Sequence, residues 1–214
     1  FYSKKSHDIF SANENLLRSK IAEKIIDKFL YIVNSYCKTS NEFKVYNEKE
    51  NTGFLKHIVV RNNEKNEVMI VIVINKKSQY RLLTKVLEKL YDENNEVKSV
   101  YISIKNESNN VILGEEIRHV FGEKYLEEEI EGIKFKIYPD SFFYFYKNQT
   151  VKLYKKAIEY LGESKDKTII DAFSGNGTIA MILSKKAKKV IGIESVESSV
   201  VSGNFTIKEN NLNN

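Results

Sequence analysis

A short strand, a turn containing two glycines and a helix follow one another directly in this chain, and this stretch constrains the fold most. Thr168 to Asp171 form a brief, mainly apolar strand pattern, and Thr178 to Lys186 show helical spacing. Gly175 and Gly177 lie between them. Because glycine has no Cβ, the chain can bend sharply there and a ligand can approach the backbone. We therefore expect a binding turn at the carboxyl end of a strand.

A second strand is predicted from Lys189 to Glu194, so the order strand, helix, strand indicates the opening unit of a doubly wound α/β sheet. Its last residue, Glu194, is placed much like the acid that binds ribose in dinucleotide enzymes, about 20 residues beyond the glycines. A carboxylate there could accept hydrogen bonds from both ribose hydroxyls. The alternative is a glycine turn that only connects a strand to a helix.

The glycines leave the ligand open, because Gly175, Gly177 and Ala180 also fit the fingerprint of nicotinamide dinucleotide enzymes. Asp171 favours another cofactor. A carboxylate just before the turn would repel a pyrophosphate, whereas S-adenosylmethionine lacks phosphate and carries positive charge on its ammonium and sulfonium groups. We predict S-adenosylmethionine, and an NAD-dependent oxidoreductase remains the rival enzyme class.

The preceding part of the chain is predicted to be a mixed α+β domain. Helices are expected at residues 15–34, 80–91 and 151–161, and strands at 57–61, 67–74, 97–104, 111–113, 125–130 and 133–138. Pro139 fixes its own φ and biases Tyr138 toward extended backbone, so a boundary is expected there. The predicted domains are residues 1–138 and 139–214.

Composition excludes several classes of protein. One cysteine, Cys37, cannot form an internal disulfide, and no apolar run is long enough for a membrane span, so a cytoplasmic protein is expected. The net charge of +5 and the pI near 9.0 would help a polyanion approach without selecting one.

Several ordered segments resemble the RNA uracil-5 methyltransferases that act on 23S ribosomal RNA and on transfer RNA. They are residues 1–9, 55–61, 110–114, 139–143, 171–180 and 187–194. The resemblance implies a central α+β domain followed by the start of a class I, Rossmann-like methyltransferase domain. It also implies methyl transfer from S-adenosylmethionine to C5 of a uridine, with ribosomal RNA preferred as substrate and transfer RNA as the other candidate. The oligomeric state stays open, with a monomer expected.

The same resemblance assigns roles to single residues. Phe173 and Thr178 would line the cofactor pocket, Gly175 and Gly177 would form its floor, and Glu194 would hold the ribose. Two structural alternatives stay open: Phe173 as a core residue and Thr178 as a helix N-cap. With Asp171, these are the predicted cofactor-binding residues.

Departures from the family pattern limit the expected activity. Tyr144, Phe145 and Tyr146 replace a cofactor-contacting glutamine, an apolar residue and an asparagine, and Asn15 replaces the last cysteine of an iron–sulfur site, so no cluster is expected. The family's catalytic cysteine and base would lie after residue 214, and Cys37 is interpreted as a structural thiol. We therefore expect an inactive fragment without catalytic residues, or else a non-catalytic RNA-binding relative.

Basic and aromatic residues could contact RNA beside the cofactor. The basic candidates are Lys4, Lys5, His7, Lys56, His57 and Arg61, and the aromatic ones are Phe142, Phe143, Tyr144 and Tyr146. The acidic run Glu127, Glu128, Glu129 and Glu131 is expected to be a solvated edge turned away from phosphates. Lys185, Lys186, Lys188 and Lys189 are expected at and after the end of the second-domain helix.

Overall fold

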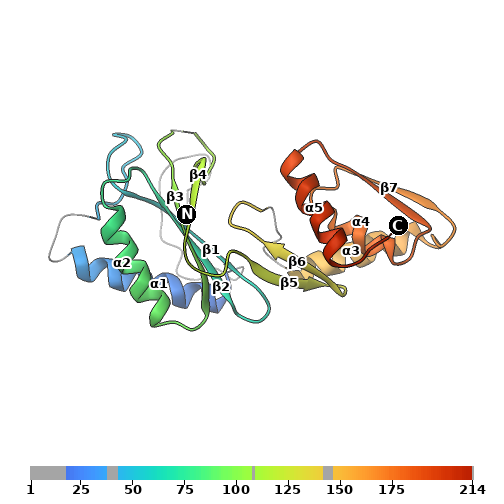
Figure 1. Cartoon of the computed structure of the whole chain (residues 1–214), viewed down its shortest axis with the longest axis horizontal. Coiled ribbons are helices and arrows are strands. Elements are labelled where there is room, and N and C mark those ends of the chain that lie inside the picture. The colour runs from blue at the N-terminus through green and yellow to red at the C-terminus, as the bar shows by residue number, and fades with distance from the viewer. Residues whose placement is uncertain (1–17, 38–42, 108, 142–146, 214) are drawn as a thin grey trace.

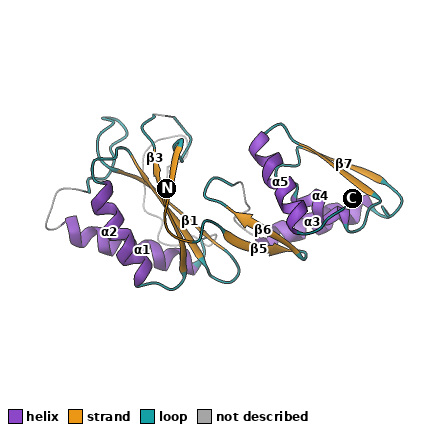
Figure 2. Ribbon diagram, viewed as in Figure 1, coloured by secondary structure: helices purple, strands orange, loops and turns teal. Residues whose placement is uncertain are grey.

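The computed structural model describes residues 18–37, 43–107, 109–141 and 147–213. It is a mixed α/β chain with two lobes joined by a β-hairpin (Figures 1 and 2). The elements are, in chain order, α1 (Lys20–Cys37), β1 (Leu55–Asn62), β2 (Val68–Ile74), α2 (Tyr80–Asp92), β3 (Val97–Ile104), β4 (Glu116–Gly122), β5 (Leu126–Ile130), β6 (Ile133–Ile137), α3 (Lys147–Leu161), β7 (Thr168–Ala172), α4 (Thr178–Ser184), β8 (Lys189–Ile193) and α5 (Glu197–Glu209). None of the described helices is long and apolar enough to cross a membrane.

The first lobe is built on a four-stranded sheet in the order β1-β2-β3-β4. The β1–β2 and β3–β4 pairs are antiparallel, and β2 and β3 run parallel. All seven residues of β2 are buried, as expected for a central strand covered on both faces. Helices α1 and α2 pack on one face through Phe29, Leu83 and Leu87, which join Ile70 and Ile102 in one hydrophobic cluster.

The hairpin β5–β6 connects the lobes. Leu126, Ile130 and Phe135 point into a second hydrophobic cluster, which includes Met69 of β2 and Met181 of α4. This cluster therefore has members on both sides of the predicted boundary at Pro139, and that boundary remains a prediction.

The opposite face of the hairpin is charged. Glu127 pairs with Lys136 across the strands and Glu129 with Lys134. Glu128 differs from its neighbours, because it is buried and its Oε2 accepts a hydrogen bond from the Glu64 backbone N–H at 3.1 Å. The expectation of a wholly solvated acidic run is wrong for Glu128, since alternate residues of a strand face opposite sides.

The second lobe contains a parallel pair of strands, β7 and β8, joined by α4. This is the strand, helix, strand order predicted from residues 168–194. On one face, Ile169 packs against Leu183 of α4 and Ile158 of α3. On the other face, Ile170 and Ile193 are 62% and 54% exposed, so the described chain leaves that side of the sheet uncovered.

Two elements differ from the sequence prediction. Residues 111–113 are not a strand, and the sheet is instead completed by β4, whose apolar residues do not alternate regularly with polar ones and so give little strand signal. Val111 and Ile112 are largely exposed. The turn at Gly114 is tight, because a Cβ there would lie 1.8 Å from the carbonyl oxygen of Ile104. Helix α5 was not predicted, because its apolar residues do not concentrate on one side.

Side chains fasten helix α5 to the hairpin: Lys136 Nζ donates to Glu209 Oε2 at 2.9 Å, and Asn210 makes two further contacts. Asn210 Oδ1 accepts a hydrogen bond from the Lys134 backbone N–H at 2.8 Å, and Asn210 Nδ2 donates to the Lys134 carbonyl at 2.9 Å. We expect Asn210→Ala to lower the free energy of unfolding by about 1 to 2 kcal/mol, since two hydrogen bonds are lost. Urea denaturation measures this, with Asn213→Ala as the control. Equal stability of both variants would show that this contact contributes nothing.

Candidate functional site

The glycine turn lies at the carboxyl end of β7. It is closed by a hydrogen bond from the Gly177 N–H to the Ser174 carbonyl at 2.8 Å, and the Ser174 N–H donates to the Ile193 carbonyl at 3.0 Å. Gly175 and Gly177 have φ values of 56° and 79°. Such left-handed backbone favours glycine, so the sharp bend predicted at these two positions is present.

Glu194 follows β8 and joins the turn to the start of α5. Its Oε2 accepts a hydrogen bond from the Gly175 N–H at 2.9 Å, and its Oε1 accepts from the N–H groups of Ser195 and Val196 at 2.7 and 2.8 Å. Hydrogen bonds from Val196 and Gly175 lower the pKa of Glu194 below its usual range. Because a carboxylate oxygen has about two acceptor positions, Oε2 can accept one further hydrogen bond, whereas Oε1 is already crowded.

A pocket of about 130 Å³ opens between the turn, β8, α4 and α5. Gly175, Gly177 and Glu194 all line it, so the structure brings these three predicted residues together. Its apolar lining comes from Met181, Val190, Val200, Ile207 and Leu212, and its polar lining includes Ser174, Asn176, Ser199 and Asn204. The volume is below the roughly 300 Å³ of a complete small-molecule site, so the pocket could enclose one part of a ligand.

The charge of the residues that line the pocket limits which classes of ligand can bind there. Glu194 is the one charged residue among those that line it, and none of them is lysine or arginine. A pyrophosphate would therefore meet a carboxylate without a compensating cation, whereas a neutral or cationic nucleoside would not be repelled.

Asp171 does not line this pocket. Its Oδ2 accepts a hydrogen bond from the Ala180 N–H at 3.1 Å, which satisfies one of the free N–H groups in the first turn of α4. Glu194, which does line the pocket, is therefore the carboxylate whose charge would act on a ligand there, in place of Asp171.

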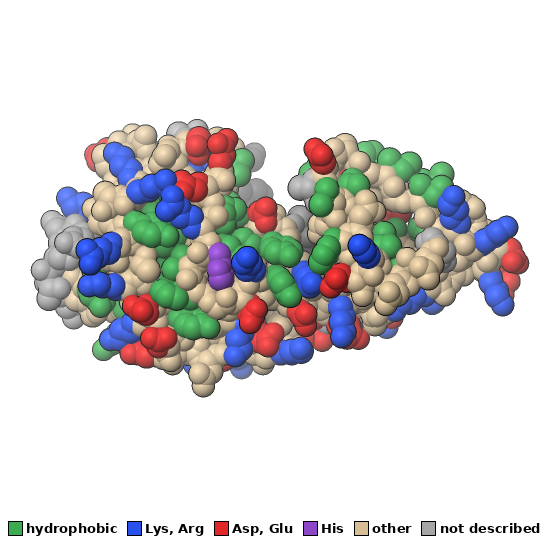
Figure 3. All heavy atoms as spheres, viewed as in Figure 1, with side chains coloured by type: hydrophobic (Ala, Val, Ile, Leu, Met, Phe, Trp, Pro, Cys, Tyr) green, Lys and Arg blue, Asp and Glu red, His purple; other side chains and the backbone are tan. Residues whose placement is uncertain are grey.

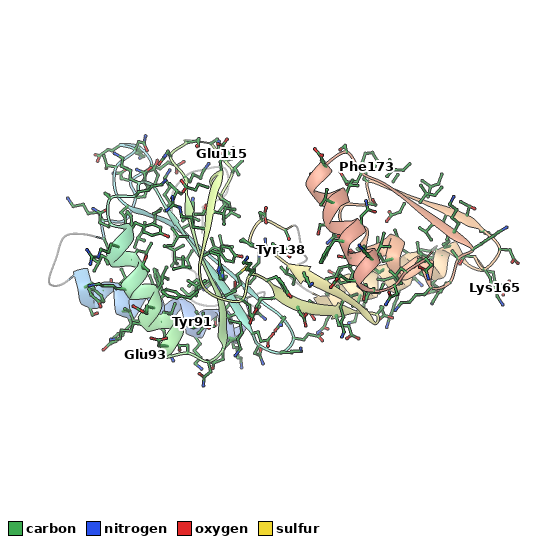
Figure 4. The ribbon with its side chains drawn as sticks, in the orientation of Figure 1. Tyr91, Glu93, Glu115, Tyr138, Lys165 and Phe173 are labelled. Atoms are coloured by element: carbon green, nitrogen blue, oxygen red, sulfur yellow. The ribbon has the colours of Figure 1, made fainter. Side chains whose placement is uncertain are left out.

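Phe173 and Thr178 also lie outside the pocket lining. Phe173 is 92% exposed and has a φ of 62°, so the core-packing alternative is wrong. Figure 4 shows it at the edge of the second lobe, at the opposite end from Lys165. Thr178 is buried, and its hydroxyl donates to Asn176 Oδ1 at 2.8 Å. The N-cap of α4 is Gly177 instead of Thr178.

Helix α5 supplies the part of the site that sequence reasoning missed. Gly203 is buried against the turn, and a Cβ on it would lie 2.9 Å from the Asn176 carbonyl oxygen. Ser199, Val200 and Asn204 come from the same helix. The sequence feature that could have indicated this contact is Gly203, a small residue that follows Glu194 in the chain. A single glycine in a polar stretch, however, does not predict a helix.

The RNA candidates are only partly placed. Lys4, Lys5, His7, Phe142, Phe143, Tyr144, Phe145 and Tyr146, like Asn15, lie outside the described residues. Arg61 donates from Nη2 to the Pro139 carbonyl at 3.2 Å, and Lys56 donates to the Lys105 carbonyl at 2.8 Å. Burial lowers the pKa of His57. Arg61 and Lys56 thus have structural partners within the first lobe and its junction.

The role of Asp171 leads to a prediction with a pH dependence. Burial raises the pKa of Asp171, and the bond from Ala180 opposes this more weakly. A raised folded-state pKa means that the stability contributed by this carboxyl is present below its unfolded pKa and is lost as pH rises through its folded pKa. We expect Asp171→Ala to cost about 1 kcal/mol of unfolding free energy because the cap is lost.

Asp171→Asn is the matched variant, because it keeps an acceptor oxygen and removes the charge. Its unfolding free energy relative to wild type should increase as pH rises from acid to neutral, measured by urea denaturation at several pH values. An advantage that instead grew toward acid pH would mean that a cation stabilises this carboxylate.

Comparison with known proteins agrees with a methylase. A family model described as DNA methylase matches residues 3–202. An uncharacterized RNA methyltransferase of Fusobacterium nucleatum is 41% identical over 214 residues, and one of Clostridium tetani is 33% identical over 214 residues. Each match covers 100% of this chain and 45% of the relative, so the chain spans about half the length of these curated relatives.

A solved structure shares the fold. The Pyrococcus abyssi tRNA (uracil-54, C5)-methyltransferase in complex with S-adenosyl-L-homocysteine has a TM-score of 0.78 at 24% identity. The match covers 98% of this chain and 48% of that chain.

Proposed function

The chain belongs to the methylase family whose model it matches over residues 3–202, and we propose that it is the cofactor-binding part of an RNA methyltransferase that uses S-adenosylmethionine. The observation that carries this proposal is the pocket beside the glycine turn, where Glu194 is the one charged lining residue. A cofactor with a sulfonium and no phosphate suits that charge. The same feature disfavours the nicotinamide alternative.

The adenosine part of the cofactor is proposed to occupy the pocket. Glu194 Oε2 would accept one ribose hydroxyl in its remaining position, while Gly175 and Gly177 allow the ligand to approach the backbone. Apolar side chains such as Val190 and Val200 would contact the base. When bound, the cofactor supplies a methyl group activated by the sulfonium.

RNA is favoured over DNA as the methyl acceptor. The family model is described as DNA methylase, but the relatives that align with the whole chain are named RNA methyltransferases. The neighbour with the same fold acts, by its name, on a uracil of transfer RNA. We propose C5 of a uridine as the acceptor, with 23S ribosomal RNA as the first substrate to test and transfer RNA as the second.

Methylation of C5 needs groups that the pocket does not contain. A thiolate must add to C6 so that C5 can attack the methyl group, and a base must then remove the C5 proton before the thiolate leaves. Cys37 is the last residue of α1, in the other lobe (Figure 1). We propose that the thiolate and the base belong to the length of the relatives that this chain does not match.

A chimera tests the proposal. This chain would replace the matching 45% of the Fusobacterium nucleatum relative, and the product would be incubated with methyl-labelled S-adenosylmethionine and with 23S ribosomal RNA, transfer RNA or DNA. The expected result is label in 5-methyluridine of RNA, and none with the unfused chain. Label in DNA, or on an exocyclic nitrogen of a base, would contradict the proposal.

A further inference from the structure

The positive charge of the chain is concentrated in one segment. Residues 147–189 contain ten lysines and four acidic residues, whereas the whole chain has a net charge of +5. The remaining residues are therefore almost neutral as a group. A concentration of like charge raises the local electrostatic potential and attracts a polyanion.

Six of these ten lysines lie in two adjacent loops and at the first residue of β8. One loop connects α3 to β7 and the other connects α4 to β8. The N–H groups of Lys188 and Lys189 donate to the Lys167 carbonyl at 3.2 and 3.3 Å, and the Ser164 hydroxyl contacts the Lys186 carbonyl at 3.4 Å. The two loops thus form one surface, which we call the lysine edge, consisting of Lys165, Lys167, Lys185, Lys186, Lys188 and Lys189.

The lysine edge is not neutralised by its surroundings. All six lysines are exposed. Lys185 donates to the Glu131 carbonyl at 2.7 Å, and the other five form no ion pair with any residue that the structure describes. Glu163 and Asp166 are the acidic residues in these loops. Figure 3 shows lysine and arginine side chains gathered at this end of the second lobe.

We propose that the lysine edge is an RNA-binding surface that contacts the phosphate backbone away from the nucleotide to be methylated. This inference rests on the proposed function, which makes RNA the polyanion. The two loops themselves contribute no aromatic or large apolar side chain. Tyr160 and Leu161 at the end of α3 are the exposed ones next to them, and two such residues do not make the apolar face by which a helix lies in a membrane surface.

The position of the lysine edge determines how much RNA the protein must contact. Lys167 lies directly before β7, and the glycine turn lies directly after β7. Lys165 and Phe173, which are labelled in Figure 4, mark the two ends of this strand. Five strand residues at about 3.3 Å each separate the ends by about 17 Å. An RNA that reaches both must extend over about five nucleotides at 3.4 Å per nucleotide of a helical strand. The lysine edge therefore binds sequence flanking the target.

Neutralising three lysines tests this surface. The variant Lys165→Gln, Lys167→Gln, Lys188→Gln is compared with a control of equal charge change in the first lobe, Lys65→Gln, Lys85→Gln, Lys98→Gln. The probe is a folded fragment of 23S ribosomal RNA, and its affinity is measured over a range of salt concentrations. We expect about tenfold weaker binding for the edge variant and a salt slope shallower by about 2, with much smaller changes in the control.

Further measurements distinguish failure of the lysine-edge inference from failure of the proposed function. Arginine at the same three edge positions should retain wild-type affinity, because it keeps the charge. Equal losses in the edge and control variants would overturn the inference and leave the proposed function intact. Absence of RNA binding by the wild-type chain, with S-adenosylhomocysteine still bound, would overturn both. Edge-dependent binding to phosphatidylserine vesicles in place of RNA would overturn the inference in favour of a membrane.

Discussion

Replacing Glu194 by alanine is expected to weaken binding of S-adenosylhomocysteine by about 100-fold. The carboxylate accepts hydrogen bonds from Gly175, Ser195 and Val196, so its loss frees the glycine turn from α5 as well as removing the ribose acceptor. The predicted loss is large because the same change removes a charge-assisted hydrogen bond to the ligand and the anchor that holds the turn in place. Isothermal titration calorimetry measures the change.

Two variants sharpen this prediction. Glu197→Ala removes an exposed carboxylate in the first turn of α5 and should leave the affinity unchanged. Glu194→Gln retains one acceptor oxygen and should lie between wild type and alanine. Because its pKa is lowered, the stability that Glu194 contributes is present above its unfolded pKa and is lost only as pH falls through its folded pKa. If Glu194→Ala bound S-adenosylhomocysteine as tightly as wild type, Glu194 would not be a cofactor-binding residue.

The second large effect is expected from Gly203→Val. Gly203 is buried against the turn, and its Cβ alone would lie 2.9 Å from the Asn176 carbonyl oxygen, a backbone atom that moves only with the turn. Two further methyl groups would enter the space that the ligand needs. We expect affinity for S-adenosylhomocysteine to fall by at least about tenfold, since overpacking of this kind costs about 1 to 3 kcal/mol.

The neighbouring Ser202→Val variant is the control for Gly203→Val, because it introduces the same β-branched residue one position earlier on α5, and Ser202 does not line the pocket. Its affinity for S-adenosylhomocysteine should stay close to that of wild type. If both variants bound the ligand as tightly as wild type, the pocket beside α5 would not be the cofactor site.

The proximity of Gly175, Gly177 and Glu194 was predictable because it depends on short-range sequence pattern. The two glycines and Glu194 come together because a parallel strand pair fixes where both carboxyl ends lie, and this geometry follows from the order strand, helix, strand. The strands predicted at residues 67–74, 125–130 and 133–138 likewise follow from local composition and correspond to β2, β5 and β6.

The parts that were missed depend on tertiary contacts. Helix α5 is placed by Asn210 and Gly203, whose partners lie in β6 and in the glycine turn, and its own sequence has little amphipathic pattern. In edge strand β4, which is paired with β3, the apolar residues Ile117, Val120 and Phe121 do not alternate regularly with the polar ones. The sequence also gave no sign that Asp171 would cap α4 or that Phe173 would be exposed, because side-chain direction at a turn follows from backbone angles.

The most direct test of the central claim is an amide NMR titration of the ¹⁵N-labelled chain with S-adenosylhomocysteine. We expect saturable shifts of the Gly175, Gly177 and Val196 amides, no shift at Val71 in the first-lobe sheet, and no response of the turn to NADH. Shifts with NADH instead, or a glycine turn that stays unchanged at saturating S-adenosylhomocysteine, would contradict this claim.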